Sequence, residues 1–309
     1  MTNMSPILVT GAAGKIGGVG RKIVEELRRK DLPVRAMVHS EDERAKSLRA
    51  LGAEVVCGNL TEPNDVVRVL AGCRRVYFGM SVAANYLEAS CVFTAAAKEQ
   101  GDLEVLINIS QMTVSQMSLT QMTNSKQQKM HWLVEQVMNW SGVPAVHIRA
   151  TAFLEHFFFS AWAAESIAKE GTIRLPFGNA QTSPVATEDV ARVIATILEN
   201  PEGHIGKVYE LTGPKSQSIS AMAKEYEEAL NRSVKYVDVP FEEWYQNEFL
   251  PKGLPDHVAG HIKEMARLHA ADRYNRETRD VEKVTGKPAT TVRDYVRTND
   301  EVFGQLKIT

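Results

Sequence analysis

The chain has 309 residues, 44% of them apolar, so it can bury the core of one large domain or of a domain with a smaller lobe. Its 36 basic and 38 acidic residues give a formal net charge of -2 with no long run of either sign. The charge distribution therefore does not indicate nucleic acid or an anionic membrane as a partner. The apolar stretches are too short to span a bilayer and the N-terminus lacks a secretory pattern, so we expect a soluble cytoplasmic protein.

A glycine-rich stretch near the N-terminus is the most informative part of the chain. Thr10-Gly11-Ala12-Ala13-Gly14-Lys15-Ile16-Gly17 follows an apolar run at 7–9 and precedes a helical pattern at 23–27. A strand that enters such a turn and then a helix lets backbone N–H groups close on a pyrophosphate. Gly11 would allow the tight turn, Gly14 the approach of phosphate, and Gly17 the packing of helix on strand. The G-x-x-G-x-x-G spacing is also compatible with an ordinary turn and a glycine helix cap.

Strands and helices then alternate up to residue 109. Strands are predicted at 33–39, 53–60, 75–80 and 103–109, and helices at 63–70 and 86–100. Ser40 with Glu43 three residues later forms a capping box, which predicts a further helix reaching about residue 51. This alternation indicates a parallel sheet covered on both faces.

Residues 111–130 break the alternation. Met112, Met117, Met122 and Met130 lie among Ser, Thr, Gln and Asn, with too little apolar periodicity for a core helix. The stretch is either a solvated loop anchored by its methionines or an adaptable wall over a substrate pocket. A helix at 126–140 and a strand at 143–149 are predicted to follow.

Beyond Thr151 the alternation loosens. An aromatic-rich helix, packed between two lobes, is predicted over Phe153, Phe157, Phe158, Phe159 and Trp162. Thr187 would cap a helix to about 198, and a strand is expected at 208–212. The fold class is therefore α/β, a Rossmann-type doubly wound parallel sheet with a smaller, mostly helical C-terminal lobe. We expect an NAD(P)-binding domain at 1–150, to which 183–215 return, and a substrate or effector lobe at 151–182 and 216–309.

Cysteine and histidine spacing gives no metal site. Cys57, Cys73 and Cys91 cannot all pair and show no C-x-x-C spacing, which predicts free buried thiols in a reducing compartment. His257, His261 and His269 recur at helical spacing, but no further ligand is visible, so a charged surface helix is the simpler interpretation.

Several later motifs carry a family resemblance. They are Val34-Arg35-Ala36-Met37-Val38-His39, Gly58-Asn59-Leu60, His131-Trp132-Leu133-Val134-Glu135, Ser141-Gly142-Val143-Pro144 with Arg149, Thr187-Glu188-Asp189-Val190-Ala191, and Tyr209-Glu210-Leu211-Thr212-Gly213. With the N-terminal fingerprint, the chain resembles the NmrA-like group of atypical short-chain dehydrogenases/reductases over nearly its full length. The resemblance implies a Rossmann fold and a nicotinamide cofactor. That group contains triphenylmethane- and quinone-reducing enzymes and also nucleotide sensors that have lost catalysis.

The chain departs from the catalytic pattern of active relatives, in which a tyrosine donates the proton and a lysine four residues later assists it. Counting back from Glu135, the resemblance places Gln127 at the tyrosine and His131 at the lysine, while Ser110 matches the family serine. Gln127 is no acid, whereas an imidazole can contact ribose or relay a proton. His131 is therefore either a partly exposed helix residue or a group beside the nicotinamide, and Ser110, Gln127 and His131 are the catalytic candidates.

The cofactor is expected in the crevice at the strand ends. Its predicted contacts are Thr10, Gly11, Ala13, Gly14, Lys15, Ile16, Gly17, Arg35, His39, Asn59, Leu60, Gly79, Met80, Ser110 and His131. NADP(H) is favoured over NAD(H), because His39 stands where an NAD site has a carboxylate, and Lys15, Arg35 and Arg44 could neutralise a 2′-phosphate. Asn59 stands where the family usually has aspartate, and its amide oxygen could accept from the adenine amine.

Two functions stay open. One is an NADPH-dependent reductase of a small conjugated acceptor such as a quinone, dye or enone; the other is a non-catalytic NADP(H)-responsive regulator that acts through a protein partner. The predicted pocket wall consists of Met112, Met117, Met122, Phe153, Phe157 and Trp162. No metal is expected.

Overall fold

The computed structural model describes residues 5–14 and 18–304, and the chain forms two compact units. The first unit comprises the described residues up to Met122, together with Gln127–Ala150 and Thr187–Glu210. The second comprises Thr123–Lys126, Thr151–Ala186 and the described residues from Leu211 onward.

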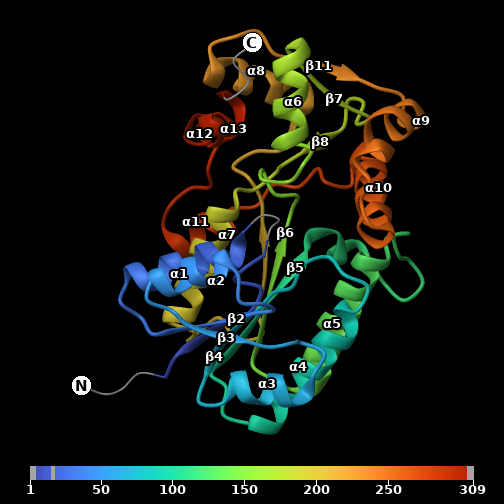
Figure 1. The fold of residues 1–309 in the computed structure, drawn as a ribbon. Coiled ribbons are helices and arrows are strands. Elements are labelled where there is room, and N and C mark those ends of the chain that lie inside the picture. Colours follow the sequence, from blue (N-terminus) through green and yellow to red (C-terminus); the bar gives the residue numbers. More distant parts are fainter. Residues whose placement is uncertain (1–4, 15–17, 305–309) are drawn as a thin grey trace. The chain divides into compact units, whose positions relative to one another are not determined.

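The first unit is built on a seven-stranded sheet with the order β3-β2-β1-β4-β5-β6-β9 (Figure 1). The pairings among its first six strands in that order are all parallel. The chain starts at β1, moves outward through β2 and β3, and then crosses to β4 on the other side of β1, which is the doubly wound arrangement. The predicted fold class is confirmed. The strands are β1 (Ile7–Val9), β2 (Val34–Val38), β3 (Glu54–Cys57), β4 (Arg75–Phe78), β5 (Val105–Gln111), β6 (Ala145–Ala150) and β9 (Val208–Leu211).

Helices cover both faces of this sheet (Figure 1). On one face lie α1 (Val19–Arg29), α2 (Glu43–Ala50) and α7 (Thr187–Glu199); on the other lie α3 (Pro63–Leu70), α4 (Tyr86–Gln100) and α5 (Lys126–Ser141). The second face carries a buried apolar cluster, in which Val76 and Phe78 of the sheet meet Val66, Phe93 and Val134 from the three helices. Burial of this apolar stripe from each helix fixes the layers and leaves the loops at the strand ends to form a site.

The second unit is mostly helical, with two small sheets in which β7 pairs in parallel with β11 and β8 pairs antiparallel with β10. Strand β7 was not expected from the sequence. The helices and strands are α6 (Ala161–Glu170), β7 (Thr172–Leu175), β8 (Gln181–Thr182), β10 (Gln217–Ser218), α8 (Ile219–Leu230), β11 (Lys235–Asp238), α9 (Phe241–Trp244), the π-helix η2 (Tyr245–Phe249), the 3₁₀ helix η3 (Leu250–Lys252), α10 (Asp256–Ala270), α11 (Asp280–Thr285), α12 (Val292–Thr298) and α13 (Asp300–Gly304).

The start of α2 differs from the prediction. Asp42, not Ser40, is the N-cap, and its carboxylate accepts from the backbone N–H groups of Arg44 and Ala45 at 2.9 and 3.2 Å. The capping-box prediction at Ser40 is therefore wrong. A carboxylate placed next to the first free N–H groups caps the helix and leaves Ser40 in the loop after β2.

The aromatic segment after Thr151 is also not the predicted helix. Phe153 pairs with Val185 and the N–H of Leu154 donates to the carbonyl of Val185, so this backbone is extended. Turns follow, and helix α6 begins only at Ala161. The hydroxyl of Ser160 donates to the carbonyls of Glu155 and His156, which competes with helical bonds in these turns.

The methionine-rich stretch has two parts. The 3₁₀ helix η1 (Met112–Gln116) follows β5 directly, and Met112 is fully buried. A bridge between Ser118 and Gln121 then closes a turn at whose tip Leu119 is 79% exposed. The stretch is therefore not solvated throughout, since its first part belongs to the core of the first unit.

Two further predictions need correction. His261 and His269 are buried within the second unit, so a charged surface helix does not account for them. The three cysteines are unpaired, but Cys91 is exposed and only Cys73 is fully buried.

Among the described residues, no group of three or more potential ligand side chains could hold a metal ion. None of the helices in the described part of the chain has both the length and the apolar character to cross a membrane.

Candidate functional site

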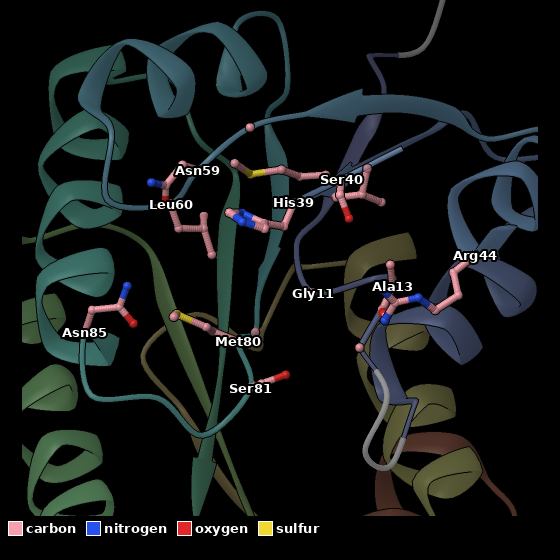
Figure 2. Close-up of a pocket in the computed structure, with 15 residues that line it drawn as sticks. Gly11, Ala13, His39, Ser40, Arg44, Asn59, Leu60, Met80, Ser81 and Asn85 are labelled. Carbon is pink, nitrogen blue, oxygen red and sulfur yellow. The ribbon is translucent and has the colours of Figure 1, made fainter. Parts of the chain in front are cut away.

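A cavity of about 530 Å³ lies at the carboxyl ends of β1, β2, β3 and β4 (Figure 2). This is the edge of the sheet where the strand order reverses between β1 and β4, and doubly wound proteins bind ligands in that crevice. Each strand contributes its end and the loop that follows it. The lining residues are Gly11, Ala13, Gly14, Met37, Val38, His39, Ser40, Arg44, Gly58, Asn59, Leu60, Gly79, Met80, Ser81 and Asn85.

Gly11 and Gly79 form the close contact between the loops after β1 and β4. Gly11 has a φ of +65°, and a Cβ built there would lie 2.6 Å from the carbonyl oxygen of Gly79. Thr10 locks the same contact, because its hydroxyl donates to the carbonyl of Gly79 at 2.8 Å and accepts from the N–H of Gly79 at 2.9 Å. Thr10 is fully buried and is not among the residues that line the cavity, so in this structure it acts on the cavity by positioning Gly79.

The glycine loop continues into α1, whose N-cap is Gly18. Lys15, Ile16 and Gly17, which the sequence places in the cofactor site, lie outside the described residues. The close packing expected of Gly17 is found at Gly20, where a Cβ would lie 2.8 Å from the carbonyl oxygen of Gly11. The sequence interpretation missed Gly20, although its position three residues after Gly17 continues the same spacing. The first turn of α1 has no acidic side chain, so its N–H groups and positive dipole end favour an anion.

Arg44 lies at the rim of the cavity beside the end of β2. Its guanidinium donates to the carbonyl of Ala13 at 2.6 Å and to the carboxylate of Asp42 at 2.9 Å, which connects α2 to the glycine loop (Figure 2). The Arg44 guanidinium also holds the pKa of Asp42 below its usual value. Among the described residues that line the cavity none has a carboxylate, while Arg44 has a permanent positive charge.

Arg35 does not belong to this site. Its guanidinium donates to the carboxylate of Glu54 at 2.9 Å and to the carbonyls of Val69 and Ala71 at 3.0 and 2.7 Å. Arg35 is the second residue of β2, whereas the cavity lies at the far end of that strand. A strand has its two ends at opposite edges of the sheet, so the structure does not bring Arg35 to the cavity where the cofactor contact was predicted.

Asn59 lines the cavity as predicted, but its amide oxygen is already used. That oxygen accepts from the backbone N–H of Thr61 at 3.1 Å and from the Thr61 hydroxyl at 3.0 Å. A carbonyl oxygen has two acceptor sites, so the expected bond from an adenine amine has no acceptor here. Asn59 instead offers an N–H donor, which suits a ring nitrogen of adenine.

The three catalytic candidates lie in the first unit and are buried. Ser110 is on β5, and its hydroxyl has no hydrogen-bond partner among the described residues. A buried hydroxyl without a partner costs free energy unless a ligand or water satisfies it. His131 is 6% exposed and contacts the Tyr86 hydroxyl through Nδ1 at 3.0 Å and the Gln127 amide nitrogen through Nε2 at 3.3 Å. The interpretation of His131 as a partly exposed helix residue is therefore wrong.

The six residues of the predicted pocket wall are divided between the two units. Met112, Met117 and Met122 belong to the first, and none of them lines its cavity. Phe153, Phe157 and Trp162 belong to the second, where Phe157 and Trp162 stack with ring centroids 5.3 Å apart. Trp162 also lines a second cavity of about 530 Å³ within that unit, whose rim carries Glu165, Lys169 and Lys252.

Comparison with known proteins now places the chain in a family. The NmrA-like family profile matches residues 3–301, so the chain belongs to the NmrA-like family. Among curated proteins, it is similar to the NAD(P)H azoreductase of Xenophilus azovorans, with 27% identity over 300 residues that cover 96% of this chain and 99% of the relative.

Two solved structures of similar fold are informative. One is the NADPH-dependent quinone oxidoreductase QOR2 of Escherichia coli in complex with NADPH, with a TM-score of 0.81, 20% identity, and coverage of 95% of this chain and 99% of that one. The other is NmrA, a negative transcriptional regulator, in complex with NADP, with a TM-score of 0.81, 18% identity, and coverage of 98% and 99%. At these identities the likeness establishes the fold.

Proposed function

We propose that this protein is an NADPH-dependent reductase of small conjugated acceptors of the quinone, dye or enone type. The observation that carries the proposal is the cavity at the switch point, with its glycine contact on one side and Arg44 on the other. Membership in the NmrA-like family and the likeness to an NAD(P)H azoreductase and an NADPH-dependent quinone oxidoreductase support it.

The residues present fit a dinucleotide. We assign the pyrophosphate to Gly11, Ala13 and Gly14 at the start of α1, together with Lys15, Ile16 and Gly17 from the sequence pattern. Asn59 and Leu60, with Gly79 and Met80 opposite, would hold the adenosine part. The nicotinamide part would give the Ser110 hydroxyl the partner that it lacks among the described residues. When bound, the cofactor supplies the hydride, and the protein supplies orientation and a dry site.

The lining favours NADP(H) over NAD(H). An NAD site uses a carboxylate at the end of the second strand to hold the ribose 2′-hydroxyl, and here His39 and Ser40 stand at that place. The Arg44 guanidinium, already fixed by Asp42 and Ala13, could give a charge-assisted bond to a 2′-phosphate.

The acceptor class follows from the residue at the tyrosine position. The Gln127 amide cannot release a proton to an alkoxide as it forms. A conjugated acceptor spreads the charge that it gains and can take its proton from water, so it tolerates this change better than a simple ketone does. The residues predicted for its apolar wall stay a prediction for each unit by itself, namely Met112, Met117 and Met122 in the first unit and Phe153, Phe157 and Trp162 in the second. We likewise propose that residues 1–150 with 183–215 bind the cofactor and that the remainder forms the substrate or effector lobe.

The test is NADPH oxidation, followed by the loss of its near-ultraviolet absorbance, against quinones, azo and triarylmethane dyes, enones and simple aldehydes. We expect turnover of at least one conjugated acceptor and poor turnover of simple carbonyl compounds. Fast reduction of a simple ketone would contradict the role given to Gln127, and tight NADPH binding without any turnover would contradict the reductase.

A second candidate is an NADP(H)-responsive regulator that acts through a protein partner. The likeness in fold to the regulator NmrA in complex with NADP favours it. It predicts that NADPH binding changes the protease sensitivity of residues 111–125, where Leu119 is exposed, in a protein that oxidises NADPH with no acceptor.

A further inference from the structure

A buried hydrogen-bond network in the first unit connects helix α5 to the segment between β4 and α4. Gln127 and His131 lie one turn apart on α5, and both are buried. The Gln127 amide oxygen accepts from the backbone N–H of Ala83 at 3.3 Å. His131 Nδ1 lies 3.0 Å from the hydroxyl of Tyr86, and the two rings are tilted with centroids 4.4 Å apart.

The amide of Gln127 fixes the tautomer of His131. Because its oxygen faces Ala83, its NH₂ group faces His131 Nε2 at 3.3 Å. An amide nitrogen only donates, so Nε2 must accept and the ring proton lies on Nδ1. Nδ1–H then donates to the hydroxyl oxygen of Tyr86. Both ring nitrogens of His131 thus meet protein groups.

This network acts on residues that line the proposed cofactor cavity. Ala83 lies between Ser81 and Asn85, both of which line it, and Tyr86 is the first residue of α4. Gln127 holds the segment at its middle through Ala83, and His131 holds its end through Tyr86. At its start, Gly79 is held by Thr10. The segment 79–86 is therefore fixed at three points, two of them from α5.

We propose that Gln127, His131 and Tyr86 are positioning residues that clamp the cofactor-lining segment 80–85. In this assignment the residue at the tyrosine position orders the cofactor loop and donates no proton, and His131 works through Tyr86 and Gln127. The inference rests on the proposed cofactor site but not on any acceptor being reduced.

The test compares nucleotide affinity with turnover in Gln127→Met, which keeps the side-chain length and loses both amide contacts. We expect the Kd and the KM for NADPH to rise about tenfold, the effect of losing roughly one buried hydrogen bond. At saturating NADPH, kcat with a quinone should stay within about twofold. Gln127→Glu should restore part of the affinity, because a carboxylate still accepts from the N–H of Ala83 and its second oxygen can accept from His131 once Nε2 carries a proton. Tyr86→Phe should raise the Kd as well.

Two control variants separate the clamp from general damage. Gln136→Met changes a glutamine on the same helix whose amide contacts the carbonyl of Trp132, and it should bind NADPH like the unchanged protein. Tyr226→Phe removes a buried hydroxyl in the second unit and should also leave the affinity unchanged. Thermal unfolding of every variant checks that it is folded, and Gln127→Glu and Tyr86→Phe still test the clamp if Gln127→Met does not fold.

Several results would overturn the clamp. Unchanged NADPH affinity in both Gln127→Met and Tyr86→Phe is one, and an equal loss in Gln136→Met is another. A fall in kcat at saturating NADPH with unchanged Kd would make the network part of proton transfer instead. Absence of NADPH binding by the unchanged protein would remove the site altogether. The unchanged protein could also bind NADPH and reduce no acceptor. Weaker NADPH binding by Gln127→Met would then support the clamp, although the proposed reductase activity would be refuted.

Discussion

Replacing Gly11 by alanine should damage the turn that holds the proposed cofactor cavity together. The φ of +65° costs an L-residue about 1–2 kcal/mol. The new Cβ would also lie 2.6 Å from the oxygen and 3.1 Å from the carbon of the Gly79 carbonyl, and the Thr10 hydroxyl holds that backbone in place. Crowding of this kind adds about 1–3 kcal/mol, so we expect a total destabilisation of about 3 kcal/mol.

Gly72→Ala is the matched control. Gly72 has a φ of +75°, and a Cβ there would meet no described atom within 4 Å, so this variant carries the backbone strain without the crowding. In urea unfolding followed by tryptophan fluorescence, Gly11→Ala should be about 2 kcal/mol less stable than Gly72→Ala. In titrations, only Gly11→Ala should lose NADPH binding, because the displaced Gly79 lines the cavity. Equal stability of the two variants, or unchanged NADPH binding by Gly11→Ala, would refute this reasoning.

Two further predictions concern Arg44 and the buried histidines. Arg44→Gln should raise the Kd for NADP(H) about 10- to 50-fold and the Kd for NAD(H) by less than about threefold, because only NADP(H) has a 2′-phosphate. Calorimetric titration with both cofactors measures this. An equal loss of affinity for both would contradict the proposed specificity. Burial lowers the pKa of His261 and His269 to about 3, whereas the unfolded chain takes up these protons near pH 6.5. Their contribution to stability is therefore complete above that pH and is lost as the pH falls. Each of these histidines should lower the free energy of unfolding by about 2 kcal/mol at pH 5 relative to pH 8, a range in which most carboxylates do not titrate. Urea unfolding at both pH values measures this difference. Equal stability would show that the imidazoles are hydrated in the folded protein.

The order of the elements could be read from the sequence because it depends on local patterns. Short apolar runs bounded by glycine and by helical periodicity predicted the strands of the doubly wound sheet, and the glycine-rich turn after the first strand predicted where its crevice would bind a ligand. Parallel strands bring their carboxyl ends to one edge, so His39, Asn59 and Gly79 could be assigned to one cavity although they are far apart in the chain.

Only the tertiary structure decided what each side chain contacts there. Arg35 and Arg44 look equally suited to a phosphate in the sequence, but they lie at opposite ends of the sheet. In the sequence, Gln127 stands out only because it occupies the position where active relatives have the tyrosine. Its hydrogen bond to Ala83 depends on how α5 packs beside the loop after β4. Propensity and periodicity are set by neighbours within a few residues, whereas a hydrogen bond between residues 44 positions apart exists only after the layers have packed.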